Sequence, residues 1–159
     1  MAGFTLTSTQ FSGQISKACV FNGMGAGGDN QSPDLSWSGA PAGTKSYVLI
    51  LHDPDAPTPA GFTHWCVFNI PASCSRLDSG ASNNAMPSGS VEVTNSYGMP
   101  GYGGACPPPG DLAHAYHFTL YALDTEKLEL DASTPPPKVI FMAKDHVIGK
   151  TGLTAFYAR

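Results

Sequence analysis

The chain has 159 residues, of which 42% are hydrophobic and 13% are charged, and its formal net charge at pH 7 is −4. This acidic balance argues against binding of nucleic acid, which needs a basic surface, and against electrostatic docking on anionic lipids. The length fits a single domain over residues 1–159, and no apolar run approaches the roughly 20 residues of a membrane-spanning helix.

Short apolar runs separated by clusters of glycine, proline, asparagine and aspartate indicate a mostly β architecture. A first short strand is expected at residues 4–6, and the glycine-rich residues 22–34 are expected to form a surface loop. Residues 46–51 are a continuous apolar run, which predicts a strand that is covered on both faces. A second strand of this kind is predicted at residues 64–70, where Pro71 ends it.

The following segments continue the β pattern. Residues 72–89 are small and polar and offer little to a core, whereas residues 91–93 alternate like an edge strand or a half-buried strand. Residues 116–123 alternate with a period of two, which predicts a strand with one buried face. If this strand begins earlier, His114 lies on the same face as Tyr116, and two polar groups then point together at one strand end.

One helix is predicted near the C-terminal end. Thr134 is its expected N-cap, and the prolines of residues 135–137 suit its first turn. Apolar residues recur at helical spacing after these prolines, and Gly149 or Gly152 is expected to end the helix. Residues 153–157 then form a short final strand.

Two segments carry ionisable side chains on turn-forming backbone. In the first, Asp53 and Asp55 flank Pro54, which biases the preceding backbone towards extended geometry, so both carboxylates could line one wall of a site. The alternative is turn chemistry, because an aspartate beside a proline commonly caps a turn through its own side chain. The bond between Ala56 and Pro57 could be cis and would then sharpen this turn.

The other candidates are two histidines and a tyrosine at junctions between loops and strands. The imidazoles of His64 and His114 and the hydroxyl of Tyr116 could all donate hydrogen bonds to an anion. The glycines of residues 101–104 and Gly110 could leave backbone N–H groups free to approach a small ligand, as in an anion-binding nest. Taken alone, each histidine would be interpreted as a surface or satisfied core residue, but together they indicate a binding site.

These motifs resemble those of the phosphatidylethanolamine-binding proteins, and most closely their bacterial and archaeal branch, described as Raf-kinase-inhibitor-like. The resemblance rests on DPDAP at residues 53–57, HW at residues 64–65 and YGGACPPPGDLAHAYHFTLYALD at residues 102–124. It implies an antiparallel Greek-key β-sandwich with one or two short helices and an anion-binding pocket at one end. By similarity, the ligand-binding positions are Asp53, Asp55, His64, Gly104, Ala105, Pro107, His114 and Tyr116.

Two departures from the family pattern concern this pocket. The family often has proline where Ala105 stands, and arginine between the histidine and the tyrosine, where this chain has Ala115. The missing arginine removes a positive charge beside the pocket, which bears on the affinity for a dianionic phosphate or a protein partner.

The resemblance implies a binding protein for a phosphoethanolamine-like or phosphorylated ligand, with a regulatory role in signalling and a kinase or protease as a possible partner. The carboxylates could raise the pKa values of the histidines and receive an ammonium group, so binding is expected to weaken above those pKa values. No cofactor is expected, and bacterial relatives suggest a homodimer.

Two other functions stay open. A low-activity hydrolase could use histidine and aspartate in the same pocket, with Cys106 as a nucleophile activated by His114. A metal site could draw on His52, His64, His114 and the two aspartates, although their spacing lacks a local metal-binding signature. Three aromatic or sulfur-containing residues are interpreted as core rather than as a ligand box: Trp37, Tyr97 and Met99.

The cysteines show no CxxC spacing and are expected to be reduced thiols of a cytoplasmic protein. They are Cys19, Cys66, Cys74 and Cys106. Residues 1–10 lack the basic start and apolar stretch of a signal peptide. A periplasmic or secreted mature chain is the alternative, because cysteine usage alone does not decide the compartment.

Overall fold

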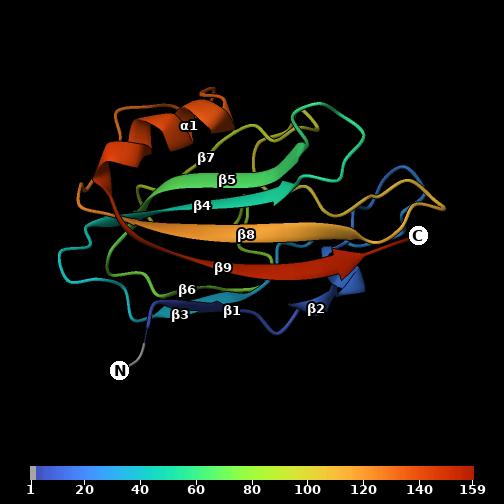
Figure 1. Ribbon diagram of the computed structural model, residues 1–159, viewed down its shortest axis with the longest axis horizontal. Coiled ribbons are helices and arrows are strands. Elements are labelled where there is room, and N and C mark those ends of the chain that lie inside the picture. The colour runs from blue at the N-terminus through green and yellow to red at the C-terminus, as the bar shows by residue number, and fades with distance from the viewer. Residues whose placement is uncertain (1–2) are drawn as a thin grey trace.

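Two β-sheets and one short α-helix form the fold in the computed structural model, which describes residues 3–159 (Figure 1). This confirms the mostly β architecture. The elements are β1 (Thr5–Thr7), β2 (Phe11–Ile15), β3 (Leu35–Ser38), β4 (Ser46–Asp53), β5 (Phe62–Pro71), β6 (Arg76–Leu77), β7 (Val91–Glu92), β8 (His114–Leu123), α1 (Pro136–Ala143) and β9 (Val147–Tyr157). Two single-turn 3-10 helices lie at Lys17–Cys19 and Lys144–His146.

The larger sheet has six strands in the order β2-β9-β8-β4-β5-β7, and the smaller has three in the order β1-β3-β6. Strand pairs in both sheets are antiparallel except β2 and β9, which are parallel. The expectation of a purely antiparallel fold is therefore wrong at this edge. The chain reaches β2 from the small sheet rather than through a hairpin with β9, so no tight turn imposes an antiparallel direction.

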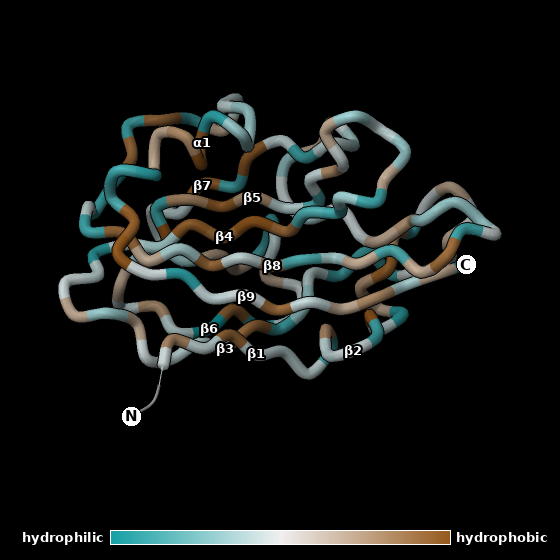
Figure 2. Tube along the Cα trace, viewed as in Figure 1, coloured by the Kyte–Doolittle hydropathy of each residue, from teal (hydrophilic) through white to brown (hydrophobic). Residues whose placement is uncertain are grey.

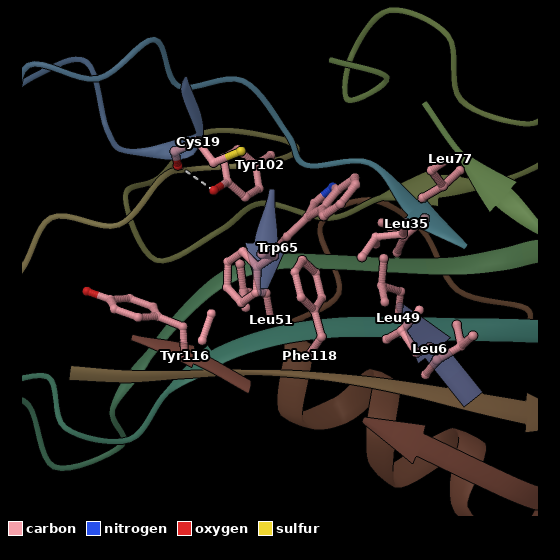
Figure 3. Packing of buried hydrophobic residues seen from close by; sticks show 14 of the residues in the cluster. Leu6, Cys19, Leu35, Leu49, Leu51, Trp65, Leu77, Tyr102, Tyr116 and Phe118 are labelled. Carbon is pink, nitrogen blue, oxygen red and sulfur yellow. Dashed lines mark hydrogen bonds between the residues drawn. The ribbon is translucent and has the colours of Figure 1, made fainter. Parts of the chain in front are cut away.

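The small sheet packs against one face of the large sheet, and the main core lies between them (Figures 1 and 3). Leu6 and Leu35 of the small sheet are buried in one cluster with Leu49, Trp65 and Phe118 of the large sheet. Burying such side chains stabilises the fold by about 1.5–3 kcal/mol each relative to leaving them exposed.

The helix α1 covers part of the opposite face of the large sheet (Figure 1). Its buried Val139 and Ala143 belong to a second apolar cluster with Val48, Cys66 and Phe68 from β4 and β5. Strands β4 and β5 are therefore buried on both faces, as their continuous apolar runs predict, and Figure 2 shows the hydrophobic character of β4.

The alternating strand β8 begins at His114, and its buried and partly exposed residues alternate along most of its length. His114 and Tyr116 therefore share the buried face, which confirms the geometric expectation from the sequence. Because His52 pairs with His117 across the sheet, the end of β4 that carries Asp53 lies beside the start of β8. The topology thus brings the two polar segments together.

The predicted start of the helix is wrong by one residue. Pro135 is the N-cap, with extended backbone and no side-chain hydrogen bond, whereas Thr134 accepts the N–H of Asp131 in the preceding turn. A side-chain cap normally accepts the N–H of the second or third helical residue. For Thr134 as N-cap these residues would be Pro136 and Pro137, which have no N–H to donate.

The predicted end of the helix is also wrong, because α1 stops at Ala143 while Gly149 and Gly152 lie within β9. A Cβ atom at Gly149 would lie 2.6 Å from the ring of Pro41, so this glycine allows close packing on the strand rather than ending a helix. Among residues 3–159, no helix has both the length and the apolar character needed to cross a membrane.

Residues 72–89 contribute more to the core than expected. They contain β6 and the buried residues Leu77 and Ala81. Of the residues interpreted as core from the sequence, Trp37 is buried as predicted but Met99 is 39% exposed.

Candidate functional site

A solvent-open cavity of about 220 Å³ lies where β4 ends and where β5 and β8 begin. The loop after β4 forms one wall of the cavity and residues 106–108 form another. The structure brings five of the eight predicted site residues to this cavity: Asp53, His64, Pro107, His114 and Tyr116.

The other three predicted residues lie outside the cavity lining. Asp55 is exposed, and its carboxylate accepts the backbone N–H of Ala115 at 2.9 Å, which ties the loop after β4 to β8. Gly104 and Ala105 are buried, and the N–H of Gly104 donates to the side-chain oxygen of Asn30 at 2.7 Å. These residues hold the walls of the cavity in place.

The predicted nest of free backbone N–H groups is not formed by the glycines of this loop. The N–H groups of Gly101, Gly103 and Gly110 donate to backbone carbonyls within the protein, at 3.2, 2.8 and 3.1 Å respectively. A Cβ atom at Gly104 would lie 2.5 Å from the backbone nitrogen of Phe21. Glycine at this position is therefore required for close packing of two loops rather than for contact with a ligand.

His64 is held in one orientation by a loop residue and is only 3% exposed. Its Nδ1 lies 2.8 Å from the carbonyl oxygen of Gly103, so Nδ1 carries the proton and Nε2 presents a lone pair. Burial lowers the pKa of His64 from 6.5 to about 4, although the hydrogen bond to Gly103 and the charge of Asp53 oppose this shift. The expected net increase in the pKa of this histidine is therefore wrong. The charge of the carboxylate does raise the pKa, but the loss of hydration lowers it by more.

Asp53 and His114 form a buried ion pair in the cavity wall. Oδ2 of Asp53 lies 2.7 Å from Nδ1 of His114, while Oδ1 accepts the N–H of Asp55 at 2.8 Å. Asp53 therefore caps a turn and also lines the cavity, whereas Asp55 does not line it.

His114 contacts a second carboxylate through its other nitrogen, since Nε2 lies 3.1 Å from Oδ2 of Asp111. Burial lowers the pKa of His114, but the hydrogen bonds and charges of Asp53 and Asp111 outweigh burial, and the net shift is upward. The expected direction is thus confirmed for this histidine.

Tyr116 is 1% exposed, and its hydroxyl accepts a hydrogen bond from the backbone of Cys106, but donates none to a residue between 3 and 159. Figure 3 shows this hydroxyl pointing away from the other labelled core side chains. Burial and the charge of Asp53 raise the pKa of Tyr116, so the hydroxyl keeps its proton at neutral pH. Its ring packs edge-on against His64, with a centroid distance of 5.3 Å.

Tyr97 and Phe62 both line the cavity. The interpretation of Tyr97 as a core residue rather than a ligand-facing one is therefore wrong, and Phe62 was not predicted. Tyr97 stacks on Phe21 at 4.1 Å, meets Phe62 edge-on at 4.6 Å, and donates its hydroxyl hydrogen to the carbonyl of Gly104 at 2.8 Å. Phe62 could have been found, because it precedes His64 by two residues on one strand and therefore shares its face. Tyr97 lies in irregular chain after β7 and carried no such periodic signal.

A cation that the sequence did not indicate lies beside the cavity. Nε of Arg159 donates to the carbonyl of Pro107 at 2.7 Å, and Nη1 donates to the carbonyl of Met24 at 3.1 Å. Met24 and Pro107 both line the cavity, so Arg159 links two of its walls. Ala115, the second departure from the family pattern, lies on the face of β8 opposite the cavity.

Of the residues considered for a metal site, His64, His114 and Asp53 line one cavity, but His52 lies elsewhere. Nδ1 of His52 lies 3.3 Å from the hydroxyl of Thr63, beside a separate cavity of about 380 Å³. Burial lowers the pKa of His52. Within the part of the chain that the structure describes, no cluster of three or more histidine, cysteine, aspartate or glutamate side chains is arranged to hold a metal ion.

All four cysteines are free thiols, as expected. Burial raises the pKa values of Cys19 and Cys66 to about 12, so both behave as small core residues. Cys106 lines the cavity.

Comparison with known proteins gives a consistent result. A family model described as phosphatidylethanolamine-binding protein matches residues 7–158. The Escherichia coli K12 protein YbcL is 42% identical over 161 aligned residues, which cover 98% of this chain and 88% of YbcL. The crystal structure of YbcL, described as a new member of the mammalian PEBP family, superposes with a TM-score of 0.94 at 40% identity, covering 99% of each chain.

Two further solved structures are similar. The Chlamydia trachomatis protein CT736 has a TM-score of 0.85 at 30% identity and covers 100% of this chain and 99% of its own. The phosphatidylethanolamine-binding protein of Plasmodium vivax has a TM-score of 0.60 at 17% identity and covers 98% of this chain and 85% of its own, a likeness that shows the fold alone.

Proposed function

The chain belongs to the phosphatidylethanolamine-binding protein family, and on this basis we propose that its cavity binds the polar head of a small phosphorylated, zwitterionic ligand such as phosphoethanolamine. One observation carries the proposal. Tyr116 and His64 line one open cavity and are almost fully buried, yet within residues 3–159 the hydroxyl of Tyr116 donates to no acceptor and Nε2 of His64 has no hydrogen-bond partner. Both groups are therefore free to hydrogen-bond a ligand that enters the cavity.

The hydroxyl of Tyr116 and Nε2 of His64 favour a ligand group that both donates and accepts hydrogen bonds. Tyr116 donates, whereas the neutral His64 accepts through Nε2. A phosphomonoester has a second pKa of about 6, so near that pH it offers both a P–OH donor and charged acceptor oxygens. Each hydrogen bond to a charged group stabilises binding by about 1.5–3 kcal/mol.

The carboxylate of Asp53 supports the zwitterionic part of the proposal. It lines the same cavity and repels an isolated anion, but it attracts an ammonium group a few ångströms from the phosphate. Arg159 provides positive charge on the side of the cavity formed by Met24 and Pro107. Charges of both signs therefore border the cavity, as a zwitterion requires.

Isothermal titration of phosphoethanolamine tests the function. We expect saturable binding to the native protein and about tenfold weaker binding to Tyr116→Phe, because this change removes one hydrogen bond worth about 1.4 kcal/mol. Tyr121→Phe is the matched control, because Tyr121 lies on the same strand but outside the cavity. The affinity of this variant for phosphoethanolamine should stay within about twofold of the native value.

The same titration at pH 6 and pH 8 should show weaker binding at the higher pH. The phosphomonoester loses the proton that it donates to His64, and His114 loses its positive charge as the pH passes its raised pKa. No saturable binding at millimolar ligand, or equal affinities of the native protein and Tyr116→Phe, would contradict the proposal.

A regulatory role towards a kinase or protease extends the proposal to a phosphorylated peptide in the same cavity. It is supported by the exposed side chain of Met24 at the cavity, 74% accessible, which could contact peptide residues flanking the phosphate. The hydrolase alternative has less support, because both ring nitrogens of His114 are occupied by carboxylates and none is free to activate Cys106. A homodimer stays a prediction, and the four free thiols support a cytoplasmic location.

A further inference from the structure

His114 has no hydrogen-bonding atom left for a ligand in this structure. Nδ1 lies 2.7 Å from Asp53 and Nε2 lies 3.1 Å from Asp111. Carboxylate oxygens only accept hydrogen bonds, so the imidazole donates both of its N–H groups to them when it is protonated. An anion that enters the cavity can bind His114 only if one of the two carboxylates leaves.

The two carboxylates are not held equally. The side chain of Asp53 is 3% exposed and is fixed by a second hydrogen bond, from the N–H of Asp55 to its other oxygen. The side chain of Asp111 is 46% exposed, and within residues 3–159 its carboxylate has His114 as its hydrogen-bond partner. An ion pair with so exposed a carboxylate contributes little to stability, so Asp111 is the carboxylate that can leave.

We infer that Asp111 is a displaceable internal anion, which occupies Nε2 of His114 until the phosphate of a ligand replaces it. This inference rests on the proposed function and assigns Asp111 a role in specificity. A ligand must compete with a carboxylate that is already at His114, and a phosphate, which has more oxygen atoms to form hydrogen bonds in the cavity, competes better than a carboxylate. Asp111 thus favours phosphorylated ligands over carboxylates of similar size.

The contacts of the loop agree with this role. Asp111 lies in the turn between residues 108 and 114, and its N–H donates to the carbonyl of Pro108 at 3.2 Å. The backbone of this turn is thus anchored beside the cavity. Displacement therefore requires only rotation of the Asp111 side chain, which stays close enough to return when the ligand leaves.

The test compares the affinities of inorganic phosphate and acetate for native protein and Asp111→Asn by isothermal titration at pH 7. We expect phosphate to bind about fivefold more tightly to the variant, and acetate binding to increase by a larger factor, so that selectivity for phosphate falls. Asp124→Asn is the matched control, because Asp124 pairs with His146 at 3.0 Å on the surface and both are about half exposed. Its affinities should equal those of the native protein.

A second measurement keeps the test independent of the stability of the variant. In the native protein labelled with ¹³C, addition of phosphate should shift the carboxyl carbon signal of Asp111 and leave that of Asp124 unchanged. Unchanged or weaker phosphate binding by a folded Asp111→Asn, with native binding intact, would overturn this inference alone. Absence of phosphate and phosphoethanolamine binding in both proteins would remove the proposed function, and this inference with it.

Discussion

Acidification from pH 7 to pH 4 is expected to lower the free energy of unfolding by about 3 kcal/mol through the protonation of His64 alone. The pKa of His64 falls to about 4 in the folded state because of burial, whereas in the unfolded chain it is close to its ordinary value of 6.5. Between these two values the unfolded chain binds one more proton than the folded protein does. The stability contributed by neutral His64 is therefore complete above about pH 6.5 and is lost as the pH falls towards 4.

Urea unfolding of native protein and His64→Gln at pH 7 and pH 4 measures this effect. Between the two pH values, the free energy of unfolding of the variant should fall by about 3 kcal/mol less than that of the native protein. The reason is that the variant has no imidazole at position 64 to protonate on unfolding. His146→Gln is the control, since His146 is exposed and should leave the acid sensitivity unchanged. Equal acid sensitivity of native protein and His64→Gln would show that His64 is not buried as a neutral group.

Replacement of Asp53 by alanine is expected to destabilise the fold by about 3 kcal/mol at pH 6. The change leaves the buried His114 without its closer partner and removes the acceptor for the N–H of Asp55. The loss should lie near the lower end of the range for broken buried pairs, because His114 can release its proton and keeps Asp111 as a neighbour.

The pH dependence identifies the ion pair as the cause. The pKa of His114 is raised in the folded protein, so its contribution to stability is complete below about pH 6.5 and is lost as the pH rises through the folded value. The difference in the free energy of unfolding between the native protein and Asp53→Ala should therefore decrease between pH 6 and pH 9. The exposed pair of Asp124 and His146 gives the comparison, and Asp124→Ala should cost less than about 1 kcal/mol at both pH values. A deficit for Asp53→Ala that is the same at both pH values would exclude a role for the charge of His114.

Much of the large sheet follows directly from the sequence pattern. The apolar runs at residues 46–51 and 64–70 predicted strands covered on both faces, and the alternation from Tyr116 placed His114 on the same face. These features could be predicted because period and burial are coupled along a single strand. The helix boundaries could not, because prolines at positions 136 and 137 fit a helix start while leaving Thr134 nothing to cap.

The chemistry of the site was less accessible from the sequence. The pKa of His64 depends on complete burial, and its tautomer depends on the carbonyl of Gly103, which is 39 residues away in the chain. Tyr97 entered the cavity from irregular chain, and Asp111 contacts His114 only because the turn before β8 folds back on itself. The features of His64 and Tyr97 depend on tertiary contacts that no local pattern encodes, whereas Asp111 and His114 lie three residues apart in a turn whose geometry the sequence did not indicate.

A crystal structure of the complex with phosphoethanolamine at pH 6 tests the ligand site most directly. We expect the phosphate within hydrogen-bonding distance, about 3 Å, of both the Tyr116 hydroxyl and Nε2 of His64, with the ammonium group directed towards Asp53. A cavity without ligand density, at a concentration that saturates binding in solution, or a ligand bound elsewhere on the surface, would contradict the account.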